Sequence, residues 1–341
     1  MTEGTRGNGA PLFRTVIKVR VCYNKQMERG SSYVQYVQKR RLQGVGAVLT
    51  AGTGYALMSI LVKGAFQLGL GPIQVIVLQS WIASLLLLIF AVVFKREIFK
   101  VSLQALRLLV VQGVVGTLGT SLLYAYSLQF LPVSVAILLL YLYPALVLVA
   151  GVLIWHKMVG RKEMVAFLLT LVGTTLASGI FSGVSGVAWV GIILGLAGAM
   201  AYASFNIIGE LVLAKVSPLV AMCYSQWVCA IVLLVILKGD IMSIPWQDAQ
   251  TWEIGFLLAT VASIIPFYMV LVGIDRLGSD KAAILSTFEL PMTFILAAVF
   301  LNEFPTGDQW IGGGLVLGGI LLLNWRSQSE QGNEENLYTE R

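Results

Sequence analysis

Long apolar segments follow one another along this chain from residue 43 to residue 325, and few folds accommodate such a succession. A helix needs roughly 20 mostly apolar residues to cross about 30 Å of hydrocarbon. Ten segments meet this requirement once short polar breaks are allowed: 43–62, 73–94, 105–127, 133–155, 164–182, 188–210, 218–237, 254–274, 281–301 and 309–325. Their apolar residues run all round each predicted helix, so we predict membrane-spanning helices and not a β-barrel.

The composition agrees with an integral membrane protein. Hydrophobic residues make up 57% of the chain and charged residues only 12%, and the mean hydropathy is +0.84. These values exclude an ordinary soluble domain of this length. The expected fold is therefore an all-α integral membrane protein with ten transmembrane helices.

The net charge of +6 belongs to the N-terminal region. Residues 1–41 contain nine Lys or Arg and two Glu, and the remainder of the chain is close to neutral. We interpret residues 1–42 as a basic cytoplasmic arm near anionic membrane lipid, without a nucleic-acid partner. Met27 begins a shorter sequence, so residues 1–26 are interpreted as an extension of the gene model. The polar segment 326–341 is expected to be a disordered cytoplasmic tail.

The basic residues of the connections predict the orientation. If the N-terminus is cytoplasmic, nine Lys or Arg fall in inner connections and two in outer ones. The inner residues are Lys95, Arg96, Lys100, Lys157, Arg161, Lys162, Lys215, Arg276 and Lys281, and the outer ones are Lys63 and Lys238. Positive charge is enriched on the cytoplasmic side of membrane proteins. Both termini are thus expected to be cytoplasmic, and the expected location is the plasma membrane.

The apolar part of the chain repeats itself at an offset of 147 residues. The segment AILLLYLYPALVLVA aligns with AILSTFELPMTFILA, and Tyr55, Gln79 and Pro144 align with Tyr202, Gln226 and Pro291. We therefore predict two five-helix repeats, residues 43–182 and 188–325. Because five is odd, the second copy must enter the membrane in the opposite sense, an arrangement typical of secondary transporters.

The repeated motif resembles the EamA-like branch of the drug/metabolite transporter superfamily. The resemblance covers roughly residues 43–325 and is carried by AILSTFELPMTFILAAVFLNE, with Pro291 and the terminal Glu303; the first copy has His156 where a Glu is expected. The resemblance implies a basket of ten helices around a central cavity. It also implies export of amino acids or other small metabolites.

Glu289 is the most informative candidate for a functional role. It lies about 8 residues beyond Lys281, which places it roughly 12 Å into the bilayer at 1.5 Å per residue. A charged group at that depth is costly and usually faces a cavity or the bundle interior. Three roles remain open: a proton-coupling group, a fixed anion that attracts a substrate ammonium, or a structural carboxylate. The aligned residue of the first repeat is Leu142.

Other polar residues near the middle of predicted helices are candidates for substrate binding. The amides and indoles could bind a substrate, and interhelical hydrogen bonding is the alternative. The candidates are Gln79, Gln226, Trp81, Trp227, Tyr55, Tyr202 and Asn206, followed by Gln112, Tyr124 and Tyr268. Pro144 and Pro291 each remove a backbone donor within a helix and are candidate hinges, with a static bend as the alternative.

The expected function is secondary transport of a small-molecule substrate, without enzyme activity, cofactor or metal. The sequence has no Walker loop, HExxH or GxSxG motif, so a gradient, such as one of protons, is the expected energy source. Two alternatives stay open: a nucleotide-sugar or phosphate-ester carrier of the same fold, and an intramembrane enzyme acting on lipid-linked substrates. The oligomeric state is not predicted.

Overall fold

The computed structural model describes residues 10–127, 129–131, 133–156, 159–177, 188–236, 243–301 and 306–324, and every regular element in these ranges is helical. The α-helices are α1 (Ala10–Gln67), α2 (Pro72–Phe94), α3 (Leu103–Val111), α4 (Gly119–Ser127), α5 (Val133–Leu140), α6 (Tyr143–Trp155), α7 (Arg161–Ala177), α8 (Trp189–Leu213), α9 (Pro218–Ile236), α11 (Ala249–Ala259), α12 (Ile265–Leu277), α13 (Ser279–Ser286), α14 (Glu289–Leu301) and α15 (Gly307–Asn324). A 3-10 helix, η1, covers Arg96–Phe99, and two π-helices, η2 and η4, cover Gln112–Leu118 and Thr260–Ile264.

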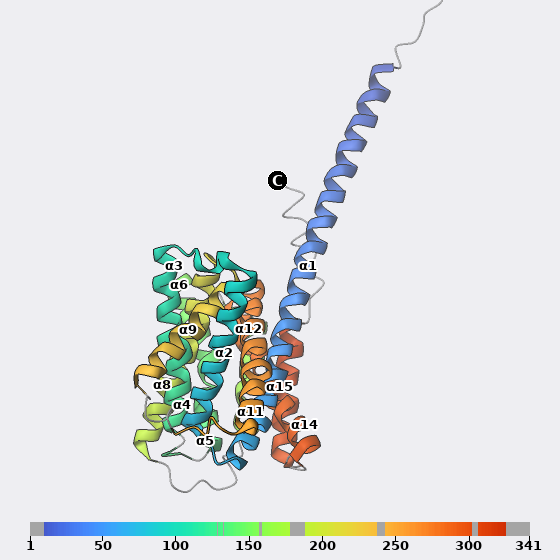
Figure 1. Cartoon of the computed structure of the whole chain (residues 1–341). Coiled ribbons are helices and arrows are strands. Elements are labelled where there is room, and N and C mark those ends of the chain that lie inside the picture. The colour runs from blue at the N-terminus through green and yellow to red at the C-terminus, as the bar shows by residue number, and fades with distance from the viewer. Residues whose placement is uncertain are drawn as a thin grey trace, which may run out of the picture. The chain divides into compact units, whose positions relative to one another are not determined.

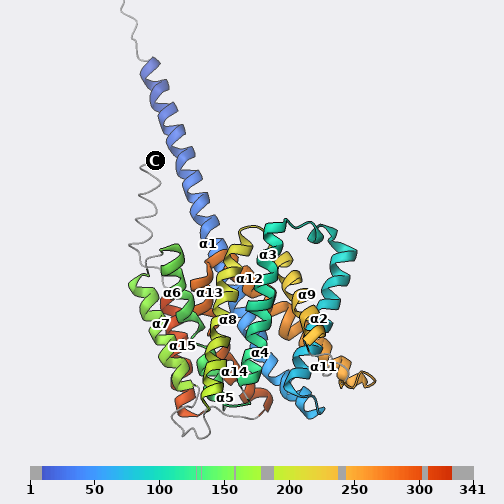
Figure 2. The same cartoon turned by 90° about the vertical axis from the view of Figure 1, so that its left-hand side faces the viewer.

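Residues 43–324 form a compact helical unit. Residues 1–42 and 325–341 belong to a separate unit. Within the compact unit the helices lie side by side and run roughly parallel to one another (Figures 1 and 2). Helix α15 packs along α7, α8 packs against α4, and α2 packs against both α9 and α11.

Seven helical stretches in the described part of the chain are long and apolar enough to cross a membrane. They are Val37–Gln67, Pro72–Phe94, Leu103–Ser127, Trp189–Leu213, Pro218–Ile236, Ala249–Leu277 and Ser279–Phe300. Each of them contains one of the ten predicted segments almost entirely. The other three predicted segments, 133–155, 164–182 and 309–325, overlap the shorter helices α5 and α6, α7, and α15, respectively. The protein is therefore a multi-pass membrane protein.

The fourth and ninth predicted helices are broken, where the sequence predicted continuous helices with a bend. The first break separates α5 from α6 after Leu140, and the second separates α13 from α14 after Ser286. A proline follows each break closely, at Pro144 and Pro291, and its missing N–H removes the hydrogen bond that would continue the helix. The breaks match to within one residue at the repeat offset of 147.

A second irregularity also recurs at this offset. The π-helix η2 lies between α3 and α4, and η4 lies between α11 and α12. Residues 112–118 correspond to 259–265 of the second repeat, which include all of η4. Such π-turns are uncommon and occur frequently at functional sites. The two repeats thus share local backbone structure as well as sequence.

Glycines at equivalent positions permit equivalent contacts between the repeats. A methyl group added at Gly44 would lie 2.8 Å from Cγ of Leu277, and one added at Gly191 would lie 2.5 Å from Cγ of Leu131. Gly44 and Gly191 are repeat partners, and Leu277 corresponds to residue 130, next to Leu131. Each repeat therefore places its first helix close to the third helical segment of the other repeat.

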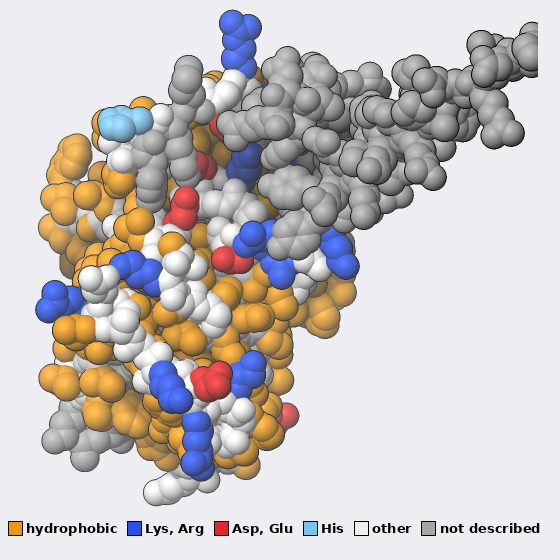
Figure 3. Space-filling model, turned by 90° about the horizontal axis from the view of Figure 1, so that it is seen from above, with side chains coloured by type: hydrophobic (Ala, Val, Ile, Leu, Met, Phe, Trp, Pro, Cys, Tyr) orange, Lys and Arg blue, Asp and Glu red, His pale blue; other side chains and the backbone are white. Residues whose placement is uncertain are grey.

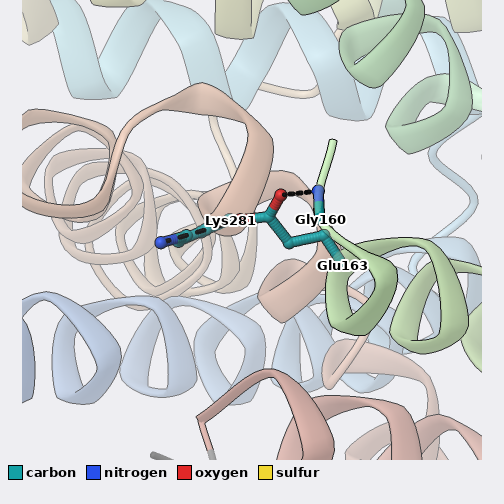
Figure 4. A network of polar contacts seen from close by, with 3 residues as sticks. All are labelled: Gly160, Glu163 and Lys281. Atoms are coloured by element: carbon teal, nitrogen blue, oxygen red, sulfur yellow. Dashed lines mark hydrogen bonds and ion pairs between the residues drawn. The ribbon is translucent and has the colours of Figure 1, made fainter. Parts of the chain in front are cut away.

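Charged side chains gather at one end of the compact unit, seen from above in Figure 3. The connections that contain most basic residues meet there. Lys281 at the start of α13 forms an ion pair with Glu163 of α7, with 3.8 Å between Nζ and Oε1, and Glu163 also accepts a hydrogen bond from the Gly160 backbone N–H (Figure 4). Lys215 donates to Gln104 at 3.3 Å. These contacts connect four segments at a single end of the protein.

Candidate functional site

Glu289 is the first residue of α14 and directly follows the second helix break. Its side chain is half-buried. Helix α1 approaches closely at Gly52, where an added methyl group would lie 3.2 Å from the Glu289 backbone nitrogen. A carboxylate in the first turn of a helix interacts favourably with the helix dipole. The break, the dipole and the contact with α1 together hold this carboxylate in the interior of the bundle.

Tyrosine side chains from several segments interact electrostatically with Glu289. Glu289 interacts electrostatically with Tyr141, which lies in the break between α5 and α6. Further electrostatic interactions with Glu289 come from Tyr55 on α1, Tyr124 on α4, Tyr143 on α6 and Tyr202 on α8. We call these five residues the tyrosine cluster. It brings together segments of both repeats.

Packing between the rings holds this cluster in place. The rings of Tyr143 and Tyr202 are 4.1 Å apart between centroids, and those of Tyr141 and Tyr143 are 6.4 Å apart. Tyr143 is only 1% exposed, and its hydroxyl donates to the Ala283 carbonyl at 2.9 Å. Tyr143 is therefore the buried packing residue of the cluster, whereas Tyr141 and Tyr202 are half-buried.

Gln79 and Trp81 lie on α2. The Gln79 side chain is half-buried, as is the Trp81 ring, which packs against the apolar cluster around Leu78 and Leu118. The indole Nε1 of Trp81 is buried and has no hydrogen-bond partner among the described residues.

The remaining predicted amides and Trp227 make interhelical or local hydrogen bonds. Gln226 is 4% exposed and donates to the Ser263 hydroxyl of η4 at 2.7 Å. Trp227 donates to the Ser84 carbonyl at 3.2 Å. Asn206 donates to the Tyr202 carbonyl of its own helix at 2.9 Å. The contacts of Gln226 and Trp227 correspond to the alternative of helix–helix bonding. The contact of Asn206 stays within α8.

Gln112 begins η2 and is fully buried. Its amide donates to the Phe205 carbonyl and accepts from the Ser225 hydroxyl, both at 3.4 Å. Tyr268 packs against the large core cluster. Gln112 therefore lies between helices at the start of a π-turn, and its amide bonds to the protein itself.

An apolar groove of about 460 Å³ lies between α2 and α11, apart from Glu289. Its lining residues are Ile82, Leu85, Leu86, Trp252, Glu253, Phe256 and Leu257. Several of them are exposed, including Leu85 and Phe256. None of the predicted site residues lines this groove, so it is a separate surface feature that faces outward.

The repeat found in the sequence and in the helix breaks also appears in a comparison with protein families. The model of the EamA-like transporter family matches the chain twice, over residues 42–179 and 189–325. The chain belongs to the EamA-like transporter family. This confirms the resemblance carried by the proline-containing motif, and it identifies the protein as a membrane transporter.

Relatives and a solved structure agree with this family. The chain is 25% identical to an uncharacterized transporter of Synechocystis sp. over 62% of this chain and 64% of that protein. It is 28% identical to an uncharacterized transporter of Archaeoglobus fulgidus (60% and 71%) and 25% identical to one of Haemophilus influenzae (80% and 94%). A crystal structure with 19% sequence identity matches with a TM-score of 0.67 over 84% of this chain and 96% of its own, which shows a shared fold.

Sequence reasoning did not select Tyr141 and Tyr143 for the site. Both belong to the segment YLYP, which aligns with FELP at the repeat offset. The signal was present: two hydroxyl-bearing rings flank the residue that aligns with Glu289. Their direction depends on the helix break between α5 and α6, which the sequence did not predict.

Proposed function

We propose that the protein is a secondary transporter that exports a small metabolite, an amino acid or a related amino compound, by alternating access coupled to protons. The observation that carries this proposal is the placement of Glu289 at a helix break, where it interacts electrostatically with tyrosines of both repeats. Family membership supports transport in general. The placement of this carboxylate supports the mechanism.

The proposed architecture is ten transmembrane helices in two inverted repeats, residues 43–182 and 188–325. Repeat-equivalent helix breaks, π-helices and glycine contacts support it. Inverted repeats of five helices allow one bundle to rock against the other around a central site. We place the protein in the plasma membrane, with both termini, the arm of residues 1–42 and the tail of residues 326–341 in the cytoplasm.

Glu289 is the proposed proton-coupling group. A carboxylate in the membrane interior can bind a proton from one side and release it to the other when access changes. Pro144 and Pro291 stand at the two breaks, where each removes one backbone hydrogen-bond donor, and they are the proposed hinges. Substrate binding and deprotonation would occur at the same place, so that one event affects the other.

Flux in proteoliposomes tests this function. Purified protein is reconstituted, a pH gradient is imposed, and amino compounds are screened for substrate-evoked proton movement with an internal pH dye. We expect Glu289→Gln to reduce the response by about tenfold or more, since a factor of ten corresponds to about 1.4 kcal/mol. The pH dependence of the remaining flux should be lost.

The matched control is Glu253→Gln, which neutralises an exposed carboxylate on α11 outside the tyrosine cluster. This variant should behave like the wild type. Unchanged flux and unchanged pH dependence in Glu289→Gln would remove Glu289 from the mechanism. Absence of flux for every compound in the wild type, with intact protein in the vesicles, would contradict transport of this class.

A further inference from the structure

Glu210, near the end of α8, binds the start of α13 through one carboxylate oxygen. Its Oε2 accepts hydrogen bonds from the Ser279 backbone N–H at 3.0 Å and from the Ser279 hydroxyl at 2.5 Å. Asp280 Oδ1 is a more distant acceptor for the same hydroxyl, at 3.2 Å. Ser279 is fully buried and Glu210 is half-buried. Because hydrogen bonds to an ionised carboxylate are stronger than those between neutral groups, Glu210 ties α8 firmly to α13.

The residues beside Ser279 contact helices of the first repeat. We call residues 276–281 the α12–α13 connection, and the end of the compact unit where it lies the charged end. The contacts reach α1, α6 and α7: Arg276 donates to Gln43, Asp280 Oδ1 lies 3.2 Å from a methyl group added at Gly151, and Lys281 pairs with Glu163. The connection therefore joins both repeats at this end, which is the proposed cytoplasmic side.

The aligned connection of the first repeat lacks the groups for the bonds of Glu210. At the repeat offset, residues 276–281 correspond to 129–134, QFLPVS, which contain no charged residue. Ser279 aligns with Pro132, which has neither an N–H nor a hydroxyl to donate. Glu210 aligns with Lys63, whose ammonium group has no acceptor. The same two bonds cannot form in the first repeat.

The other polar contacts of the α12–α13 connection have no counterpart either. Gln43 and Glu163 align with Val190 and Trp310, and neither of these side chains has an oxygen acceptor. Helix α5, which follows residues 129–134, lies nearer the opposite end of the compact unit than α13 does (Figure 2). The polar contacts at the charged end are thus specific to that end.

The apolar packing, in contrast, is alike at the two ends. Gly44 and Gly191 are repeat partners, and each allows the close approach of a leucine from the other repeat. Gln74 donates to Ser243 at 2.8 Å in the proposed outer connections, and both of these side chains are uncharged. The two ends therefore differ mainly in charge-assisted bonding.

We propose that Glu210 is a positioning residue that holds the charged end closed, so that the protein without substrate opens preferentially at the opposite end. The inference rests on the inverted repeats of the proposed function, in which one end opens as the other closes. Opening the charged end between α8 and α13 breaks the two bonds of Glu210 to a buried serine. The ion pair of Lys281 with Glu163 is partly exposed and contributes little to this preference.

Ala283 and Ala136 are equivalent positions for measuring which end opens. They are repeat partners, and both are 0% exposed. Each lies four residues beyond the start of its connection's final turn, at Ser279 or Pro132, which is about 6 Å along a helix at 1.5 Å per residue. A reagent from water reaches Ala283 when the charged end opens and Ala136 when the opposite end opens.

Alkylation of the purified full-length chain in detergent, without substrate, tests the inference. Ala283→Cys and Ala136→Cys are made separately, after the three natural cysteines have been replaced by Ala, and the rate of reaction with a water-soluble maleimide is measured. We expect the Ala136→Cys protein to react about tenfold faster than the Ala283→Cys protein, since a ten-to-one preference between two states gives rates in about that ratio.

Glu210→Gln, added to each of these proteins, tests the role of the carboxylate. It should raise the rate for Ala283→Cys about fivefold and lower the rate for Ala136→Cys about twofold, as expected when a ratio of about ten to one falls to about one to one. General loosening of the fold would raise both rates. Ser279→Ala should act in the same direction as Glu210→Gln but less strongly, because the backbone N–H still donates.

Glu163→Gln is the matched control at the same end. It removes a carboxylate from the partly exposed pair with Lys281, and both rates should stay within about twofold of those of the parent proteins. An effect as large as that of Glu210→Gln would show that the charge of the whole end, and not the buried contact with Ser279, sets the preference.

The outcomes also separate this inference from the proposed function. Equal rates for the two cysteine positions, or faster reaction of Ala283→Cys, would overturn the preference, and this comparison needs no variant of Glu210. Rates that Glu210→Gln leaves unchanged or raises together would overturn its role. Flux in proteoliposomes with such rates would retain the transporter and reject the inference. The expected rates without flux of any compound would retain the inference and reject transport.

Discussion

At the scale of single residues, the two repeats agree on structure and differ in chemistry. Pro144 and Pro291 occupy equivalent positions, and each follows a helix break. The residue two positions before each proline differs: the first repeat has Leu142 where the second has Glu289. A duplicated backbone thus places only one carboxylate at the centre.

Tyr143 illustrates a residue whose contribution is to stability. Its hydroxyl donates to the Ala283 carbonyl near the end of α13. In a continuous helix the Thr287 N–H would donate to this carbonyl, but it donates to the Ile284 carbonyl. Helix ends leave such carbonyls without intrahelical partners. We predict that Tyr143→Phe lowers the free energy of unfolding by about 1 kcal/mol, measured by thermal unfolding in detergent.

Tyr126→Phe provides the control for this prediction. It removes the same hydroxyl from a ring that is 36% exposed on α4. Its stability should change by less than about 0.5 kcal/mol. Equal destabilisation of both variants would show that the hydrogen bond to Ala283 does not add to the free energy of unfolding.

At the scale of helices, the interruptions are as informative as the spans. Both third helical segments contain a π-turn and both fourth segments are broken, at positions related by the repeat. A π-turn or a break leaves backbone groups outside the regular ladder, and in a membrane these must find other partners. Gln112, for example, links η2 to α8 and α9 through its amide.

Gly116 within η2 tests this close packing. A methyl group added there would lie 2.8 Å from Cα and 2.9 Å from Cβ of Phe205. Neither atom is at the flexible end of a side chain, so the helices themselves would have to separate. We predict that Gly116→Ala destabilises the protein by about 1–3 kcal/mol, measured as a lower unfolding temperature.

Gly46 on α1 is the matched position for comparison. An added methyl group would have nothing within 4 Å, and alanine is favoured over glycine within a helix by about 0.5–1 kcal/mol. Gly46→Ala should therefore be neutral or stabilising. A Gly116→Ala protein as stable as Gly46→Ala would show that α8 is not tightly packed against η2.

At the scale of the whole molecule, charge distribution and topology belong together. The connections rich in Lys and Arg meet at one end of the compact unit, joined by the ion pair of Lys281 with Glu163 (Figure 4). The pair itself is partly exposed, with side chains 44% and 29% accessible, and such pairs contribute little to stability. The concentration of basic residues at this end instead favours a cytoplasmic position.

We predict that both chain ends lie in the cytoplasm. An even number of crossings returns the chain to its starting side, and ten crossings are proposed here. A protease-sensitive tag at either end should resist protease added to intact cells and be cleaved after the membrane is opened. Cleavage of one tag in intact cells would exclude an even number of crossings. Cleavage of both would reverse the proposed orientation.

The sequence by itself determined the membrane-embedded class, the repeat and the position of Glu289 along the chain. These features depend on local properties: segment length, hydropathy, and identities at a constant offset. They can be predicted without coordinates because every spanning helix needs a similar length of mostly apolar residues to cross the hydrocarbon.

Only the tertiary structure decided which polar groups meet. It occupies Gln226 and Trp227 in bonds between helices, and it packs Tyr143 against Tyr202 with 4.1 Å between the ring centroids. The direction of a side chain in a bundle depends on helix rotation, and a break or a π-turn changes that rotation for every residue beyond it. Pro144 and Pro291 mark the two breaks in the sequence, but the packing of the helices decides which side chains meet beyond them.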